Sequence, residues 1–440
     1  MSQTLVICSD ESLAEILQLN LPIYVGTDVV AKTDYKNAEV LIEHHPGIHL
    51  IIVSEASAEA LTKNTYVQSR KIPLIVLGPK VKIPNSPLIT ILPSSELKVV
   101  IQAAAKYLKV TPRKMIEQVV PDFFPISISF CQNLKRAPCA IYVLKGESDY
   151  QTKYSLNENV KTEEIKALID AGTTTIYVPA PDRLKFVNHV NTSLLSRLTE
   201  AKSEEETLSA TDESLHVVRE EALKGESPVA ITTQELSSAA IQACVEIALK
   251  NPSVASLLKK LLQNKASFLY KHTQLIIHVS QHIIDKMEWG SNEQKAKLAF
   301  VAFFHDICLT DDKYIKYKSD TMVTIDTAIS NVEKDLIIGH AKIAADIVRN
   351  FPNAPIGADV IILQHHGQIS GSGFAHTFTN SISPLAIVFI IAEEFAHLML
   401  AYPENTDFSS KKKEMIARLN SMFTRSKYTK VIETLESITF

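Results

Sequence analysis

The sequence is poor in glycine, with only 12 among its 440 residues, well under half of the roughly 7% that is usual. The glycine-rich patterns G-x-G-x-x-G and G-x-x-x-x-G-K-[ST] cradle phosphates in dinucleotide-binding and P-loop folds. Neither pattern occurs in the chain. A Rossmann-type or P-loop nucleotide site is therefore excluded.

Basic charge, paired cysteines and uncharged apolar runs are scarce as well. The formal net charge of -4 provides no basic surface for DNA or RNA. The five cysteines are odd in number and form no C-x-x-C pair, as expected of reduced thiols in a cytoplasm. The N-terminal segment MSQTLVICSDESLAEIL lacks the basic start of a signal peptide. The most apolar run, Pro384–Leu400, includes two glutamates and a histidine, so we predict a soluble cytoplasmic protein without a membrane span.

Residues 1–110 are predicted to form an α/β domain. Short runs rich in valine and isoleucine alternate with helical patterns, which is typical of buried parallel strands. We expect helices that include Ser12–Leu19 and Glu96–Leu108, and strands at Leu5–Cys8, Ile23–Val25, Leu50–Val53, Leu74–Leu77 and Leu88–Leu92. Five strand–helix repeats in this length predict a doubly wound parallel sheet of flavodoxin-like order.

This rhythm of strands and helices resembles the receiver domain of response regulators. In receivers, acids after the first strand bind Mg²⁺, and an aspartate at the end of the third strand is phosphorylated. A serine or threonine ends the fourth strand, and a lysine follows the fifth strand. The corresponding positions here are Ser9, Asp10, Ser54, Gly78 and Leu92. A serine acceptor beside a single acid cannot organise Mg²⁺ for phosphoryl transfer. The resemblance therefore implies a pseudo-receiver that contacts a signalling protein partner instead of accepting a phosphate.

Residues 118–192 are predicted to form a small α+β domain. We expect paired strands at Pro125–Phe130 and Cys139–Leu144, a helix at Thr162–Ala171 and a third strand at Thr174–Val178. Residues 193–262 are predicted to be a helical linker with a break at Gly225–Pro228. A dimerisation element, and hence a homodimer, and a plain solvated connector both remain open for this segment.

Histidine is concentrated in the C-terminal part of the chain, where nine of the 14 histidines lie between His272 and His397. From residue 263 to the end, the apolar spacing predicts an all-α domain, with helices that include Phe268–Ile284, Leu298–Phe304 and Val332–Asn350. The same spacing places five histidines and two acids on buried faces or at the ends of buried helices: His272, His305, Asp306, His340, His365, His366 and Glu393.

Buried ionisable side chains are costly unless they are paired or bind a metal. Imidazole and carboxylate without thiolate suit iron or manganese better than structural zinc. Seven ligands exceed the four of one tetrahedral site, so two divalent ions that share a carboxylate are the economical arrangement. Core histidines without any metal remain a further alternative. His278 and His282 lie on another side of their helix, where we expect them to face solvent or a partner.

The order of these residues resembles the HD-GYP branch of the HD phosphohydrolases, over roughly residues 263–405. Characterised members are helical, metal-dependent enzymes that hydrolyse the bacterial messenger cyclic di-GMP. The resemblance implies that Asp306 bridges two ions and that His305 and Asp306 form the catalytic pair. A bridging water or hydroxide would then attack phosphorus. It also implies that one ion is held by His272, His305, Asp306 and Glu393 and the other by His340, His365 and His366. The implied substrate loop consists of Gly371, Ser372, Gly373 and Phe374.

Several positions depart from the pattern of the family. Leu309 stands where the family has a lysine after the His-Asp pair, and Phe374 stands where it has the tyrosine of GYP. The last aspartate is Glu393, with Glu394 and His397 as nearby competitors. His278, His282, His376 and His397 stay outside the implied ligand set. Phe268 occupies the position of the glutamate that binds a third metal in some members, so two metals are implied.

Two functions follow from these residues. The first is a metal-dependent phosphodiesterase that acts on cyclic di-GMP or a related cyclic dinucleotide and is regulated by the N-terminal domains. The alternative is a catalytically silent HD-GYP-like signalling module that binds a nucleotide or a protein partner. The changes at Leu309 and Phe374 favour the second, whereas the complete set of metal ligands favours the first.

Overall fold

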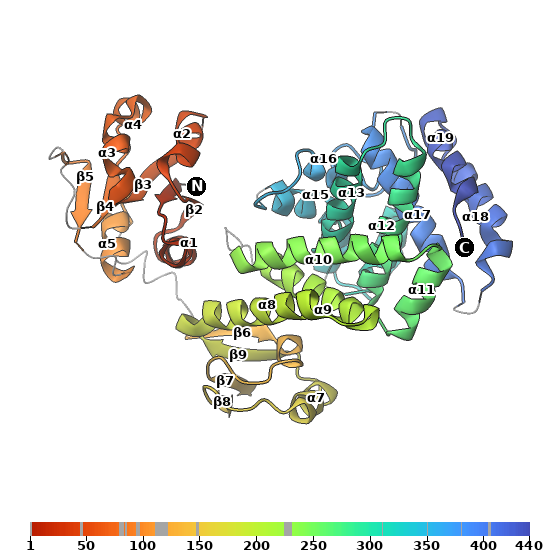
Figure 1. The fold of residues 1–440 in the computed structure, drawn as a ribbon, viewed down its shortest axis with the longest axis horizontal. Coiled ribbons are helices and arrows are strands. Elements are labelled where there is room, and N and C mark those ends of the chain that lie inside the picture. Colours follow the sequence, from red (N-terminus) through yellow and green to blue (C-terminus); the bar gives the residue numbers. More distant parts are fainter. Residues whose placement is uncertain are drawn as a thin grey trace. The chain divides into compact units, whose positions relative to one another are not determined.

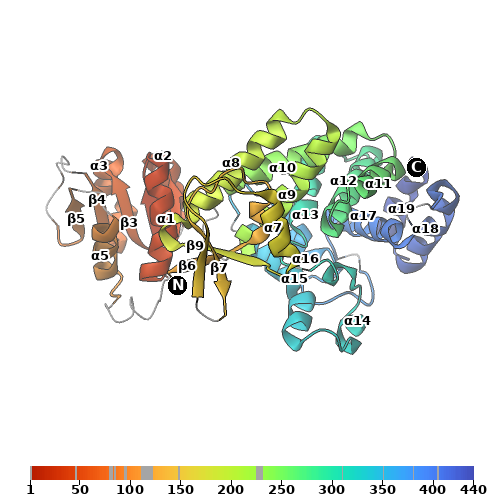
Figure 2. The same ribbon diagram turned by 90° about the horizontal axis from the view of Figure 1, so that it is seen from below.

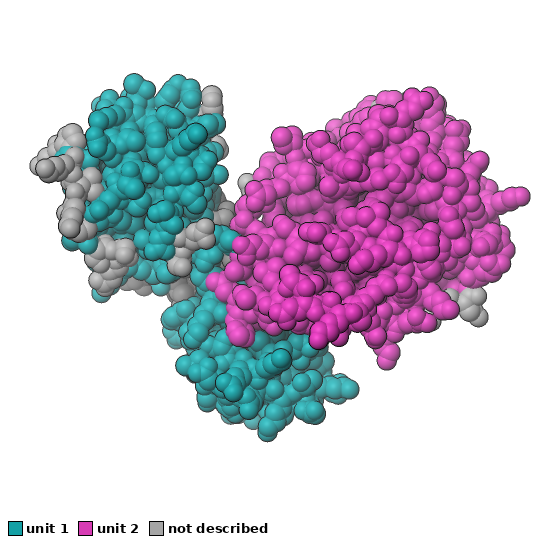
Figure 3. Space-filling model, viewed as in Figure 1, with its two compact units in different colours: residues 1–187, 226–231 teal, residues 188–225, 232–440 magenta. Residues whose placement is uncertain are grey.

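Two sheets of different kinds occupy the first part of the chain in the computed structural model, and helices occupy the rest (Figure 1). The structure describes residues 2–44, 47–78, 83, 86–93, 97–110, 122–146, 149–223, 231–309, 311–349, 351–379, 381–403 and 406–440. The chain divides into one unit of residues 1–187 and 226–231 and another of residues 188–225 and 232–440 (Figure 3).

The first sheet is the predicted doubly wound parallel sheet. All neighbouring strands pair in parallel, in the flavodoxin-like order β2-β1-β3-β4-β5. The strands are β1 (Ser2–Ile7), β2 (Thr27–Lys32), β3 (Ile48–Ser54), β4 (Leu74–Leu77) and β5 (Ile89–Leu92). The helices are α1 (Glu11–Val25), α2 (Tyr35–His44), α3 (Glu55–Lys63), α4 (Thr65–Arg70) and α5 (Leu97–Tyr107).

Alternate residues of the strands point to opposite faces of this sheet, as the period of two requires. Leu50 and Ile52 pack with α1 and α5 on one face. Ile51 and Val53 pack with α2, α3 and α4 on the other face. Both faces are therefore covered, which explains why the central strands are apolar without alternation.

One predicted strand of this domain is wrong. Ile23–Val25 lies in the last turn of α1, and the second strand begins after Gly26. Leu17, Leu21 and Val25 follow one another at four-residue spacing and are all buried, so burial in the core favours helix over the strand preference of isoleucine and valine. Gly26 ends the helix in the left-handed conformation, with its N–H bonded to the carbonyl of Pro22.

The second sheet is antiparallel and has the order β6-β9-β7-β8. Its strands are β6 (Phe123–Ser127), β7 (Ile141–Lys145), β8 (Asp149–Tyr154) and β9 (Thr175–Pro179), with helix α7 (Thr162–Asp170) before β9. The predicted pairing of the first two strands is wrong, because β9 lies between β6 and β7. The polar hairpin strand β8 was not predicted, and β6 ends at Ser127, where a 3-10 helix (Ile128–Cys131) begins.

The second unit is helical, as predicted, and includes the segment expected to be a linker (Figure 1, Figure 2). Its helices are α8 (Arg183–Glu200, from Asn188 onward), α9 (Glu204–Leu223), α10 (Ile231–Lys250, from Thr232 onward), α11 (Val254–Gln263), α12 (Phe268–Lys286), α13 (Asn292–Phe304), α14 (Asp320–Ile325), α15 (Asn331–Arg349), α16 (Ala358–Gln364), α17 (Pro384–Ala401), α18 (Phe408–Met422) and α19 (Ser426–Thr434). The predicted break at Gly225–Pro228 lies outside the described residues.

Helices α12 and α17 form the centre of this unit. The two helices pack along each other, α13 packs on α12 and α16, and α15 packs on α16. Helix α17 is long and apolar enough to cross a membrane by length and composition alone, but 67% of it is buried inside the protein. It therefore has the environment of a core helix, and it brings its few ionisable side chains into the interior.

Candidate metal centre

Helix α12 places His272 in the interior of the helical unit. The helix starts at the N-cap Ser267, whose hydroxyl oxygen accepts a hydrogen bond from the N–H of Tyr270. His272 lies on the same buried face as Leu269 and Ile276, and its side chain has no exposed surface. The predicted inward orientation of His272 is what the structure shows.

The turn that ends helix α13 carries His305 and Asp306, both almost fully buried. The His305 Nε2 atom lies 3.3 Å from the Nε2 atom of His272 and 3.2 Å from Oδ2 of Asp306. The His272 Nε2 atom lies 3.9 Å from the same oxygen. These three side chains form one group of donor atoms that lie within 4.8 Å of one another.

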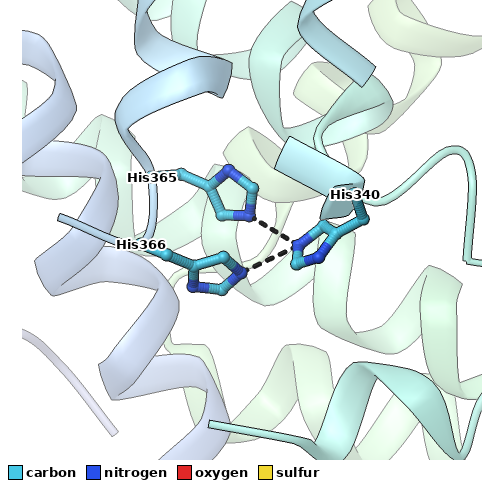
Figure 4. Close-up of side chains that lie close together, drawn as sticks. All are labelled: His340, His365 and His366. Carbon is cyan, nitrogen blue, oxygen red and sulfur yellow. Dashed lines mark hydrogen bonds between the residues drawn. The ribbon is translucent and has the colours of Figure 1, made fainter. Parts of the chain in front are cut away.

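A second group consists of His340, His365 and His366, with His340 and His365 buried and His366 partly buried (Figure 4). His340 comes from the middle of α15, and the other two follow directly after α16. The Nε2 atom of His340 lies 3.1 Å from that of His365 and 2.8 Å from that of His366. The three rings thus turn their Nε2 atoms toward a common point.

Three of these histidines have their other ring nitrogen, Nδ1, held by a backbone carbonyl. Nδ1 of His305 lies 3.0 Å from the carbonyl of Ala302. Nδ1 of His340 lies 2.5 Å from the carbonyl of Ile337, and Nδ1 of His365 lies 2.6 Å from that of Ile362. A carbonyl accepts hydrogen bonds only, so Nδ1 carries the proton and Nε2 of the neutral ring presents a lone pair. Lone pairs of neighbouring rings then face one another at about hydrogen-bonding distance, an unfavourable arrangement that a cation between them would relieve.

The carboxylate of Asp306 lies between the two groups. Its Oδ2 faces His305 and His272, whereas its Oδ1 lies 3.4 Å from Nε2 of His340 and 4.0 Å from that of His365. Oδ1 is buried and has no hydrogen-bond partner among the described residues. A buried acceptor that faces further lone pairs is costly, and a bound cation would relieve this cost. The geometry thus fits a carboxylate that bridges two ions.

Burial sets the protonation of the histidines. It lowers the pKa of His272 to about 3, with the charge of His305 as the next cause. It also lowers the pKa of His340, and it lowers those of His365 and His366 well below their ordinary value. The imidazoles are therefore neutral, which is the form that binds metal.

Glu393 lies in a third group of donors, together with His272 and His397. Glu393 and His397 are one turn apart on α17, and both are buried. Burial, followed by the negative charge of Asp306, raises the pKa of Glu393 well above its ordinary value. His397 lies outside the predicted ligand set, although its i,i+4 spacing from Glu393 was a usable signal.

The predicted substrate loop covers the second histidine group. Gly371 and Gly373 have φ values of 70° and 73°, in the left-handed region that favours glycine. The ring of Phe374 is buried and lies 4.3 Å from that of His366, between ring centroids. The side chain of Ser372 is exposed. The loop therefore presents an apolar ring to the histidines where the family has a tyrosine.

The position of the missing lysine is buried. Leu309 has 1% exposure, and its carbonyl accepts a hydrogen bond from Nη1 of Arg219 at 3.3 Å. Two lysines follow soon after Leu309 in the sequence, and the first of them, Lys313, pairs with Asp311 and Glu333. The other, Lys316, lies over the ring of Phe268. Neither is directed toward the donor groups by these contacts.

Lys318 is a cation that the sequence analysis did not identify. Its Nζ lies 3.1 Å from Oε2 of Glu394, and its side chain is partly buried. Burial is the main cause of the shifted pKa values of His272, Glu393 and His397, and the charge of Lys318 acts on all three. A positive charge therefore stands beside the group formed by His272, His305 and Asp306, which we call the first donor group.

His278 and His282 do not join the donor groups. Nδ1 of His278 lies 3.2 Å from the carbonyl of Ala248, and Nε2 of His282 lies 3.1 Å from that of Thr434. Both are partly buried and contact neighbouring helices of their own chain, not open solvent. His376 is exposed.

The donor set suits divalent transition metals. It combines imidazole nitrogens with carboxylate oxygens, and all five cysteines are free, buried thiols that belong to none of the groups. Nδ1 of His272 and Oδ1 of Asp306 are buried without hydrogen-bond partners among the described residues. The buried histidines and aspartate are therefore able to bind metal.

No protein-family model and no curated protein sequence matches this chain. The structure is similar to that of Bd1817, a protein from Bdellovibrio bacteriovorus described as an HDG"Y"P protein, with a TM-score of 0.44 and 15% sequence identity. The matched region covers 71% of this chain and 98% of that chain.

Proposed function

We propose that the helical unit is a metal-dependent phosphodiesterase of the HD-GYP type that acts on cyclic di-GMP or a related cyclic dinucleotide. The observation that carries this proposal is the position of Asp306, whose two oxygens face two different groups of histidines. A carboxylate shared between two nitrogen-rich groups is the arrangement that binuclear hydrolytic centres use.

Two divalent ions in these groups, iron or manganese by the donor set, would activate water at neutral pH and neutralise charge on the phosphoryl oxygens. The chain itself supplies the orientation. Backbone carbonyls fix the rings of His305, His340 and His365, so the donor atoms need little rearrangement. Phe389 packs against His305 and His365, with ring centroids 5.1 and 6.2 Å apart, and keeps water from this side of the rings.

In this proposal, Lys318 supplies the positive charge that the lysine of the HD-GYP pattern would supply at position 309. Its ammonium group lies beside Glu394 and acts electrostatically on the first donor group. A cation at this place favours the developing negative charge of a phosphoryl transition state. The glycine-containing loop from Gly371 to Phe374 would contact the substrate from the side of the second group.

The remaining predictions belong to the same proposal. The parallel sheet would act as a pseudo-receiver, since Asp10 caps helix α1 through a hydrogen bond from Leu13 N–H and Ser54 occupies the end of β3. It would regulate the helical unit through a protein partner. A cytoplasmic location fits the five free thiols, and a homodimer stays a prediction.

The alternative is a signalling module that binds nucleotide without hydrolysing it. The burial of Leu309 and the packing of Phe374 on His366 favour it, because both replace polar groups of the family by apolar ones. Metal binding is common to both functions, whereas turnover separates them.

The test uses the full-length protein purified without added metal. Iron and manganese per chain are measured, and hydrolysis of cyclic di-GMP is assayed for wild type, for Asp306→Asn and for Asp306→Ala. Asp335, an exposed aspartate of α15, provides the control variant Asp335→Asn. We expect about two ions per chain in wild type and the control, and loss of metal and hydrolysis in both Asp306 variants.

If wild type that contains metal hydrolyses cyclic di-GMP as slowly as Asp306→Asn does, the proposal of an enzyme is refuted. Calorimetric binding of cyclic di-GMP without product would then support the signalling module. A metal-free preparation whose melting temperature does not respond to added metal or chelator would refute both.

A further inference from the structure

Helix α17 contributes a second donor that the ligand pattern of the resemblance does not include. His397 follows Glu393 by four residues, so both side chains project from the same face of the helix. Nε2 of His397 lies 3.7 Å from Oε1 of Glu393. The rings of His397 and His272 lie 4.3 Å apart between centroids, and donor atoms of all three residues lie within 4.8 Å of one another.

Glu393 and His397 lie in the interior but do not bond to each other directly. His397 is 8% exposed and Glu393 4% exposed, and their mutual contact at 3.7 Å is too long for a hydrogen bond. Two ionisable side chains buried on an apolar helix are costly unless they are paired or bind a cation.

The separation of the two donors fits a shared ion. Donors about 2.1 Å from one metal lie roughly 3 Å apart when adjacent and about 4.2 Å apart when opposite. The observed 3.7 Å between Nε2 and Oε1 falls between these values. His278 and His282, in contrast, direct a ring nitrogen at a carbonyl of a neighbouring helix and belong to no donor group.

We propose that His397 is a metal ligand, and that Glu393 and His397 together form an i,i+4 clamp for the ion that His272 binds. This inference rests on the metal centre of the proposed function and extends it by one residue. The clamp adds an imidazole to His272, His305, Asp306 and Glu393, so this site favours metals that prefer nitrogen, and it holds its ion more tightly than these four ligands alone would.

The test is metal binding, not activity. Full-length wild type, His397→Gln and the control His376→Gln are stripped with chelator and titrated with Co²⁺. His376 is exposed and lies in none of the donor groups. We expect two ions per chain in wild type and in the control. In His397→Gln, affinity for one of them should fall by at least about tenfold, and the visible absorption of bound Co²⁺ should change because one nitrogen ligand is lost.

Melting temperatures separate a ligand from a packing residue. For a ligand, stripped His397→Gln melts close to stripped wild type, and Co²⁺ stabilises the variant less. His397→Asn, which is smaller, provides a second variant if His397→Gln does not fold. Unchanged Co²⁺ affinity and absorption in either folded variant would overturn the inference while leaving the proposed function intact. Wild type that binds no Co²⁺ would overturn both.

Discussion

Three histidines of the candidate metal centre have one ring nitrogen held by the backbone. In His305, His340 and His365 the ring nitrogen Nδ1 meets the carbonyl three residues earlier, at the end of or within a helix. This local contact fixes the tautomer without any other side chain. Sequence position alone thus determines which nitrogen faces the centre, and a change that moves one of these carbonyls would reorient the ring.

The buried His272 predicts a pH-dependent stability of the metal-free protein. Burial lowers its pKa to about 3, whereas in the unfolded chain it titrates near the ordinary value of 6.5. Between these values the unfolded chain binds a proton that the folded protein does not, so the free energy of unfolding decreases as the pH falls from 6.5 toward 3. The contribution of this residue is a loss of about 2 kcal/mol near pH 5.

Urea unfolding of metal-free protein above pH 7 and near pH 5 measures this loss. His272→Gln should lose less stability than wild type over the same interval by about 2 kcal/mol, whereas the exposed control His376→Gln should lose as much as wild type. Equal losses in wild type and His272→Gln would contradict a neutral, buried His272.

Lys318 is expected to affect turnover but not metal content. Replacing it with glutamine removes a positive charge beside the first donor group. The expected decrease in kcat/KM for a cyclic dinucleotide is about tenfold to a hundredfold, as for the loss of one charged hydrogen-bond donor. Steady-state kinetics and metal analysis of Lys318→Gln check this.

Lys313→Gln is the matched control, because Lys313 pairs with Asp311 and Glu333. It should retain wild-type kinetics. If Lys318→Gln loses metal, or keeps its full kcat/KM, then Lys318 does not act on the substrate.

At the level of elements, periodicity predicted the helices that carry the ligands. Predicted Phe268–Ile284 is α12, and predicted Leu298–Phe304 lies within α13. His272 repeats with Leu269 and Ile276 at helical spacing on α12, and the apolar end of α13 runs directly into His305 and Asp306, so the sequence indicates that these residues lie in the interior. Helix α17 is apolar on all sides, so its pattern does not separate one face from another. Spacing placed Glu393 in the interior, but the choice of Glu393 as a ligand over Glu394 and His397 came from the resemblance alone.

Elements whose position depends on distant contacts were the ones predicted incorrectly. Ile23–Val25 has strand-forming residues, but Val25 is buried against the sheet at helical spacing from Leu17 and Leu21. The polar strand β8 pairs only with β7 and lies at the edge of its sheet, so it has no apolar signal. Lys318 follows the 3-10 helix Tyr314–Lys316 and reaches Glu394 on α17. No local pattern encodes such a contact.

The loop after His366 depends on its glycines. Gly373 has a φ of 73°, and a Cβ atom there would lie 2.8 Å from Oδ1 of Asp320. The same carboxylate oxygen accepts a hydrogen bond from the N–H of Phe374 at 3.0 Å. Gly373→Ala should therefore destabilise the helical unit by about 1–3 kcal/mol, because the strained backbone and the close contact both act on this loop.

Thermal unfolding followed by circular dichroism measures this change, with Ser372→Ala as the control. Ser372 is exposed in the same loop, and its replacement should alter stability by less than about 0.5 kcal/mol. A Gly373→Ala variant as stable as Ser372→Ala would show that the loop relaxes at no cost.

At the level of the whole molecule, the proposed ligands come from separate parts of one unit. His272 lies on α12, Asp306 follows α13, His340 lies on α15, His366 follows α16 and Glu393 lies on α17. All of them belong to residues 188–225 and 232–440, and none comes from the unit with the two sheets. Bound metal would therefore cross-link the helical unit alone.

Metal removal is thus expected to weaken only one part of the chain. A ligand present at about a thousand times its dissociation constant stabilises the folded state by about 4 kcal/mol. Hydrogen exchange of full-length protein, with metal and after chelation, resolves where this stabilisation is lost. Chelation should increase exchange in α12, α13, α15 and α17, whereas the five-stranded sheet in residues 2–92 should exchange at the same rate in both states. Asp306→Asn should exchange like the chelated wild type and should not respond to chelator. Faster exchange in the sheet on chelation would contradict a metal centre confined to the helical unit, and unchanged exchange throughout would contradict a metal centre altogether.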